Sequence, residues 1–97
     1  MTAEETRAFT LLDTYARTKH RCFVAEMDLN KSGAEYILCF RPTDVSRDSP
    51  DRFACRYLHI EATRLRAAGE TPYLPSSIVL ELDKELAAFR KSMSGST

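Results

Sequence analysis

The sequence predicts a small α+β domain in the order α-β-β-α-α, with an antiparallel β-hairpin covered by helices. Apolar residues recur with helical spacing in residues 3–18, 50–68 and 76–93, and they alternate with period two in residues 21–29 and 35–41. A four-residue turn joins the two alternating runs. A chain of 97 residues supports one domain, so we expect residues 1–97 to form a single unit with a frayed tail at 92–97.

The first helix is predicted to begin at Thr2 and to run to about Thr18. Thr2 and Glu5 have the spacing of a capping box, in which each side chain accepts a hydrogen bond from the other residue's backbone N–H. Because the apolar residues fall on one side of this helix, we expect that side to cover the hairpin. These residues are Ala8, Phe9, Leu11, Leu12, Tyr15 and Ala16.

The hairpin is predicted from the two alternating runs. The turn at residues 30–33 ends at Gly33, which can adopt a positive φ. The apolar pattern and the turn length agree on one register. It places Leu29 opposite Ala34, Met27 opposite Tyr36, Ala25 opposite Leu38 and Phe23 opposite Phe40.

The other face of the hairpin carries Val24, Ile37 and Cys39 beside acidic residues. This face is too apolar to be fully hydrated, so we expect either the last helix or a second copy of the chain to pack there. A homodimer is an open alternative, because small domains commonly gain core by association.

A second helix is predicted at residues 50–68, with Ser49 as its N-cap, Pro50 in its first turn and its end at Gly69. Its apolar side would carry Phe53, Tyr57, Leu58, Ile60 and Leu65. Its outward stripe would carry Arg52, Arg56, His59, Thr63 and Arg66.

The last helix follows a tight connector at residues 71–75, and Ser76 or Ser77 is expected to cap it. Its apolar residues recur at alternating steps of three and four, which is the sharpest helical pattern in the chain. They are Val79, Leu82, Leu86, Phe89 and Met93.

Charge and cysteine content narrow the function classes. Basic and acidic residues number 14 each, so no global field attracts nucleic acid or an anionic membrane, and a charged partner must be recognised by a local patch. Residues 2–18 lack the apolar run of a signal peptide, and no stretch approaches the ~20 apolar residues of a membrane span. Three widely spaced cysteines favour reduced thiols, so we expect a cytoplasmic protein.

No residue pattern predicts catalysis, a cofactor or a metal site. Cys22 follows His20 and Arg21, which can lower a thiol pKa, but we interpret it as a small hydrophobic residue. Cys55 and His59 would share a helix face, yet the closely spaced pairs typical of zinc sites are missing from the sequence. We therefore expect a protein that is not an enzyme.

Two charged surfaces are the candidate partner-binding sites. The first is the helical face with Arg52, Arg56, His59 and Arg66, and the second is the hairpin tip with Glu26, Asp28 and Glu35. Arginine forms forked hydrogen bonds with carboxylates, which favours a protein partner. We interpret the chain as an accessory or inhibitory protein, of the type found in phages and mobile elements, that docks on a larger bacterial complex. The alternative is a nucleic-acid-binding regulator that uses the arginines.

The order of a helix, a hairpin and a later helix is superficially similar to the double-stranded-RNA-binding domain over Glu4–Arg41. That domain has a third strand and a lysine cluster at the start of its later helix. The sequence predicts neither feature here, so we assign no family.

Overall fold

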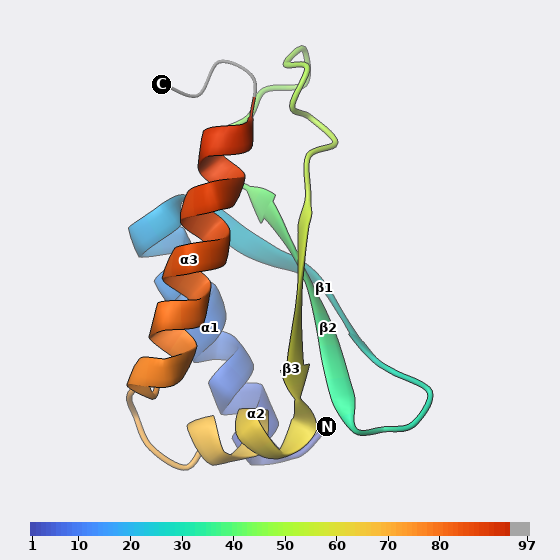
Figure 1. Cartoon of the computed structure of the whole chain (residues 1–97), viewed down its shortest axis with the longest axis vertical. Coiled ribbons are helices and arrows are strands. Elements are labelled where there is room, and N and C mark those ends of the chain that lie inside the picture. The colour runs from blue at the N-terminus through green and yellow to red at the C-terminus, as the bar shows by residue number, and fades with distance from the viewer. Residues whose placement is uncertain (94–97) are drawn as a thin grey trace.

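The sheet contains three antiparallel strands where the sequence predicts two. The computed structural model describes residues 1–93, and the elements in Figure 1 are α1 (Ala3–His20), β1 (Cys22–Leu29), β2 (Glu35–Pro42), β3 (Arg56–Glu61), α2 (Ala62–Ala68) and α3 (Ser76–Ser92). The strand order is β1-β2-β3, and the helices lie on one side of the sheet (Figure 1). The α+β class and the helix-covered antiparallel hairpin are confirmed, while the element order becomes α-β-β-β-α-α. Most of the predicted tail, at 94–97, lies outside the described residues.

The predicted helix at residues 50–68 is wrong over its first part. Residues 50–53 form a turn, and the chain becomes helical only at Ala62. Strand β3 pairs with β2 so that Leu58 lies opposite Leu38 and Ile60 lies opposite Tyr36. The strand places Ile60 in the core and packs Leu58 against it, while its even-numbered backbone groups pair with β2. The last part of the predicted helix, Ala62–Ala68, and its end at Gly69 are confirmed.

The hairpin turn is confirmed, with Gly33 at φ 75°, but the register differs from the prediction. Leu29 lies opposite Tyr36, and a β-bulge interrupts β1 between Val24 and Glu26. The bulge leaves Ala25 without a partner in the ladder and turns Val24 toward the core, where it is 8% exposed. A strict alternation over the whole strand was therefore the wrong expectation.

Helix α1 begins with the predicted capping box. The Thr2 N–H donates to Glu5 Oε1 at 2.7 Å, and the Glu5 N–H donates to Thr2 Oγ1 at 3.1 Å. Helix α3 begins after Pro75 without a side-chain cap, so the predicted role of Ser76 or Ser77 is wrong. A serine is unnecessary there because the Pro75 carbonyl accepts the first backbone hydrogen bonds of the helix.

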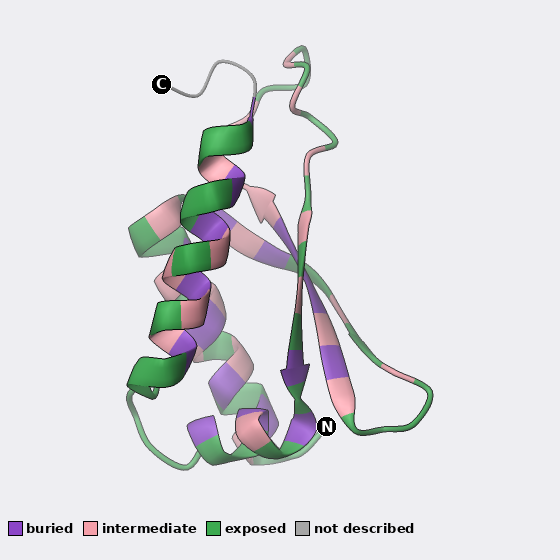
Figure 2. Cartoon of the chain, viewed as in Figure 1, coloured by how far each residue is buried: buried purple, intermediate pink, exposed green. Residues whose placement is uncertain are grey.

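The core lies between the sheet and the helices, as the buried positions in Figure 2 show. The predicted helical stripes supply much of it. Fully buried side chains come from every layer: Leu12, Leu38, Phe40, Leu65, Leu82 and Leu86 are all 0% exposed.

Gly69 is required by a close approach between α2 and α1. A Cβ atom at this position would lie 1.7 Å from the Glu4 carbonyl oxygen. Its φ of −82° is ordinary, so space and not backbone conformation explains the glycine. Arg7 reinforces the contact, because its Nε donates to the Gly69 carbonyl at 2.9 Å.

Candidate protein-binding face

One face of the sheet is not covered by a helix. Helix α3 packs on the same side as α1, so the first of the two expected alternatives, that the last helix covers the second face, is wrong (Figure 1). We call this uncovered surface the open face. Residues that pair across the strands form rows on this face. One row contains Glu26, Cys39 and Tyr57, and the next contains Asp28, Ile37 and His59. Glu35 and Glu61 form a further row at the end.

The structure brings four of the predicted site residues together on the open face. Glu26 and Asp28 lie on β1, Glu35 lies on β2, and His59 reaches the same surface from β3. His59 Nδ1 lies 2.7 Å from Glu35 Oε1 across the strand pair. The acidic cluster therefore extends over the sheet instead of being confined to the hairpin tip.

The centre of the open face is uncharged and partly apolar. Tyr57 is 57% exposed, Ile37 is half-buried, and Cys39 is buried between the strands. Burial, followed by the neighbouring Cys55, raises the pKa of the Cys39 thiol. A side-chain hydrogen bond with Cys55 raises the pKa of Tyr57 as well. Both groups thus stay protonated near neutral pH, and the uncharged centre has carboxylates along β1 and at the Glu35–Glu61 end, with Arg41 at the other end.

Sequence analysis placed Ile37 and Cys39 on this face of the hairpin but missed Tyr57 and Glu61, which reach it from β3. A period-two pattern could have identified those on β3. From residue 53 to residue 61 every odd-numbered side chain is exposed, and every even-numbered one is half-buried or buried. The run Tyr57-Leu58-His59-Ile60 is rich in strand-forming residues, which is a weaker indication than the helix caps that suggested a helix.

The predicted basic stripe does not exist as one surface. Arg52 lies in the loop before β3, Arg56 points from β3 toward the helices, and Arg66 lies on α2. The Arg52 guanidinium is 4.8 Å from the Phe53 ring centroid. Because residues 52–61 do not form a helix, their side chains no longer share a face with Arg66.

The other two arginines have partners within the chain. Arg56 Nη1 donates to Glu85 Oε2 at 3.1 Å, and its guanidinium lies 5.9 Å from the Phe89 ring centroid. Arg66 Nε lies 3.8 Å from Glu5 Oε2. These two side chains hold helices to the sheet and to each other, which is a structural role.

The cysteine considered as a nucleophile is in the core. Cys22 is 0% exposed and donates to the His20 carbonyl at 3.4 Å. Desolvation is the main cause that raises the pKa of its thiol, which is opposite to what a reactive cysteine requires. His20 is occupied elsewhere, since its Nε2 lies 2.7 Å from Asp83 Oδ1.

Within residues 1–93, no group of three or more His, Cys, Asp or Glu side chains has an arrangement that could hold a metal ion. Over the same residues, none of the helices combines the length and the apolar character needed to cross a bilayer.

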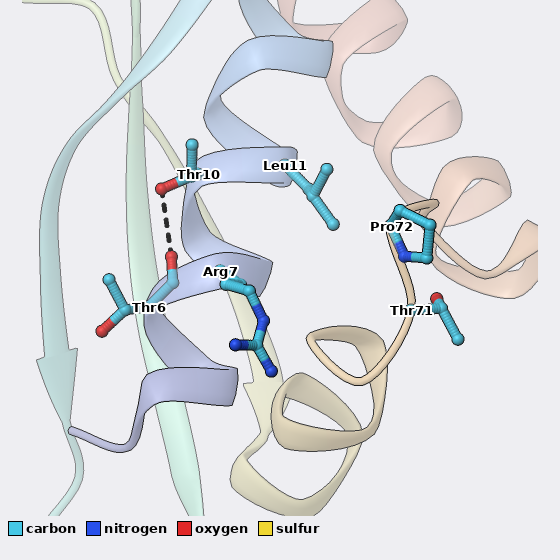
Figure 3. Close-up of a pocket in the computed structure, with 6 residues that line it drawn as sticks. All are labelled: Thr6, Arg7, Thr10, Leu11, Thr71 and Pro72. Atoms are coloured by element: carbon cyan, nitrogen blue, oxygen red, sulfur yellow. Dashed lines mark hydrogen bonds between the residues drawn. The ribbon is translucent and has the colours of Figure 1, made fainter.

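A shallow hollow of about 350 Å³ lies between α1 and the segment after α2 (Figure 3). Leu11 and Pro72 face each other across it, and Arg7 lies at its floor (Figure 3). The Thr10 hydroxyl donates to the Thr6 carbonyl at 3.1 Å, so it is directed into its own helix. The hollow can hold an apolar group, but its lining residues include no carboxylate, histidine or cysteine, and their threonine hydroxyls donate to backbone carbonyls. The lining residues are Thr6, Arg7, Thr10, Leu11, Thr71 and Pro72.

The third strand removes one of the two differences from the double-stranded-RNA-binding domain. The other difference remains, because α3 begins with Ser76 and Ser77 and has its first lysine at Lys84. The phosphate-binding start of the later helix therefore has no counterpart here.

Comparison of this chain with protein-family models, with curated proteins and with solved structures gave no match.

Proposed function

We propose that this protein is a non-enzymatic binding protein whose open face docks on a basic surface of a partner protein. The observation that supports the proposal is the arrangement of carboxylates beside an uncharged aromatic and aliphatic centre. Glu26 and Asp28 border the centre formed by Ile37, Cys39 and Tyr57 on its β1 side, and Glu35 and Glu61 border it at one end, while Arg41 lies at the other end.

This arrangement has the composition of a protein interface. Interfaces have a centre depleted in charge and enriched in aromatic residues, with a polar rim that remains accessible to water. Tyr57 suits the centre because tyrosine combines a large contact area with a hydroxyl that finds a partner. The acidic rim selects a partner with lysine or arginine at matching positions and increases the rate of encounter.

The open face, and not the predicted arginine stripe, is the proposed binding surface. A nucleic acid would meet carboxylates on the open face, and the arginines that would have contacted phosphates are dispersed. An accessory or inhibitory protein that covers a basic site on a larger bacterial complex fits the acidic surface better.

The test uses the full chain, immobilised and incubated with a nuclease-treated bacterial lysate. Captured proteins are identified by mass spectrometry, and the most abundant is purified and titrated with the free chain by calorimetry. We expect the double substitution Glu26→Lys with Asp28→Lys to abolish the interaction, because it reverses the rim charge. Tyr57→Ala should weaken it by about 30-fold or more, as for a central aromatic contact.

The matched control is Asp48→Lys with Glu70→Lys, which makes the same charge change at two exposed positions away from the open face. This variant should bind like the wild type. Equal loss in both double variants would mean that net charge alone governs binding, and the proposal would be wrong. Capture that disappears with nuclease treatment would instead favour the nucleic-acid alternative.

A further inference from the structure

Strand β3 forms an edge of the sheet with backbone groups that are free to pair. In an antiparallel ladder, hydrogen-bonded residue pairs alternate with non-bonded pairs. The Ala62 N–H donates to the Ala34 carbonyl at 2.8 Å, so the bonded positions of β3 are the even-numbered ones. The N–H and C=O groups of Tyr57 and His59 therefore point away from β2, and no backbone group within residues 1–93 bonds to them.

The opposite edge of the sheet is protected. In β1 the outward N–H of Val24 donates to Asp13 Oδ1 of α1 at 2.8 Å. The β-bulge at Ala25 distorts the same edge, and Glu26 and Asp28 add charge to it. Bulges, charges and side-chain caps are the usual means by which proteins prevent strand addition. Strand β3 has no bulge and no proline, and its central residues are Tyr57, Leu58, His59 and Ile60.

We infer that β3 pairs antiparallel with β3 of a second copy of this chain and forms a continuous six-stranded sheet. A two-fold axis at His59 keeps the helices of both copies on one side. It places Leu58 opposite Ile60 of the second copy, and Tyr57 opposite Glu61 of the second copy. On the open face a phenol then meets a carboxylate, whereas on the covered face Ile60 is already buried within each copy, so the backbone hydrogen bonds of the new strand pair supply most of the contact.

Complementarity across the two-fold axis favours a second copy as the occupant. Tyr57 and Glu61 are exposed on the same face of β3, and the pairing places the Tyr57 hydroxyl of each copy beside the Glu61 carboxylate of the other. Arg56 takes no part in the contact, because it lies on the covered face in an ion pair with Glu85. In this assembly the open faces of both copies form one continuous surface. The dimer therefore enlarges the proposed docking surface, but the evidence for the dimer does not rest on that proposal.

The first test is sedimentation equilibrium of the full chain from 1 to 500 µM, about the range in which weak pairing is measurable. We expect the mass to rise from one chain to two. His59→Pro removes the outward N–H and leaves the ladder to β2 intact, because proline is tolerated where that N–H faces solvent. By symmetry it deletes two hydrogen bonds, and the dimer should weaken by about tenfold or more. The matched control His59→Ala keeps the N–H and should dimerise like the wild type.

Amide hydrogen exchange provides a second measurement that does not require the proline variant to fold. The Tyr57 and His59 amides should gain protection as the concentration rises, while the Leu58 and Ile60 amides stay protected by β2 throughout. A single-chain mass over the whole range would overturn the inference, as would exchange at Tyr57 and His59 that is independent of concentration. Equal dimerisation of His59→Pro and His59→Ala would also overturn it.

Discussion

The two faces of the sheet are built from the same strands but differ in how far their residues are buried. On the covered face, Leu38 and Phe40 are 0% exposed and Ile60 is 1% exposed, because the helices pack over them. On the open face, the neighbouring residues Ile37 and Tyr57 remain partly or largely exposed, with carboxylates on β1 and at one end of the face. The comparison shows that an apolar residue in a strand contributes to stability only as far as another layer covers it. What remains uncovered is available for binding.

The sharpest test of this difference is a pair of adjacent substitutions in β2. Leu38→Ala should lower the free energy of unfolding by about 2–5 kcal/mol, because it leaves a cavity under the helices. Ile37→Ala should lower it by about 1 kcal/mol or less, because the side chain already contacts water. Urea unfolding followed by circular dichroism measures both values. Similar losses for the two variants would contradict the assignment of the faces.

A second pair of substitutions compares a carboxylate on the helix side of the sheet with one on the open face. Glu5 is 5% exposed, completes the capping box and accepts a hydrogen bond from Tyr36, so Glu5→Ala should cost about 1–2 kcal/mol at pH 7. Glu35→Ala should change the free energy of unfolding by no more than about 0.5 kcal/mol, because its pair with His59 is exposed.

The Glu5 effect should depend on pH in a defined direction. The hydrogen bond from the Thr2 backbone, more than any other cause, lowers the pKa of Glu5 below its usual 4.5. The contribution of Glu5 to stability is then complete above pH 4.5 and is lost as the pH falls through the folded-state pKa. Unfolding curves of wild type and Glu5→Ala should therefore converge toward low pH. A constant difference from pH 7 to pH 2, about the range that brackets this pKa, would contradict the role of the charged form.

The smallest expected difference in the free energy of unfolding is between substitutions of Arg56 and Arg41, which lie on opposite faces of the sheet. Arg56→Ala removes the contact with Glu85 and the packing on Phe89, and should cost about 1 kcal/mol because the pair is partly exposed. Arg41→Ala removes a hydrogen bond to the Arg52 carbonyl in an exposed position and should cost less than about 0.5 kcal/mol. Thermal unfolding at low and high salt would show whether the Arg56 contribution falls with screening.

Much of the fold was predictable because several elements depend on neighbouring residues. The Thr2–Glu5 box and the Gly33 turn each depend on residues only a few positions apart, and both are confirmed. The helix end at Gly69 is confirmed as well, but its glycine is required by contact with Glu4 of α1. The candidate site was predictable only in part. Glu26, Asp28 and Glu35 were named as one surface, but His59 was assigned to a different one.

The errors occurred where distant segments compete for the same residues. Residues 49–50 have the pattern of a helix start, yet residues 56–61 lie beside β2 as a strand, which pairs Leu58 with Leu38 across 20 positions of sequence. The bulge at Ala25 likewise reflects Asp13 of α1, whose carboxylate accepts the Val24 N–H. A pattern of neighbouring residues in the sequence cannot identify either of these distant partners.

The sequence by itself determined the α+β class, both long helices, the hairpin turn and the grouping of acids near the hairpin. These follow from side-chain periodicity and capping, which act within one or two turns of the chain. Only the tertiary structure decided that residues 56–61 form a third strand, that the arginines are dispersed, and that one face and one edge of the sheet stay uncovered. The physical reason is that a strand satisfies its hydrogen bonds with a distant segment, so its identity depends on which partner the folded chain places beside it.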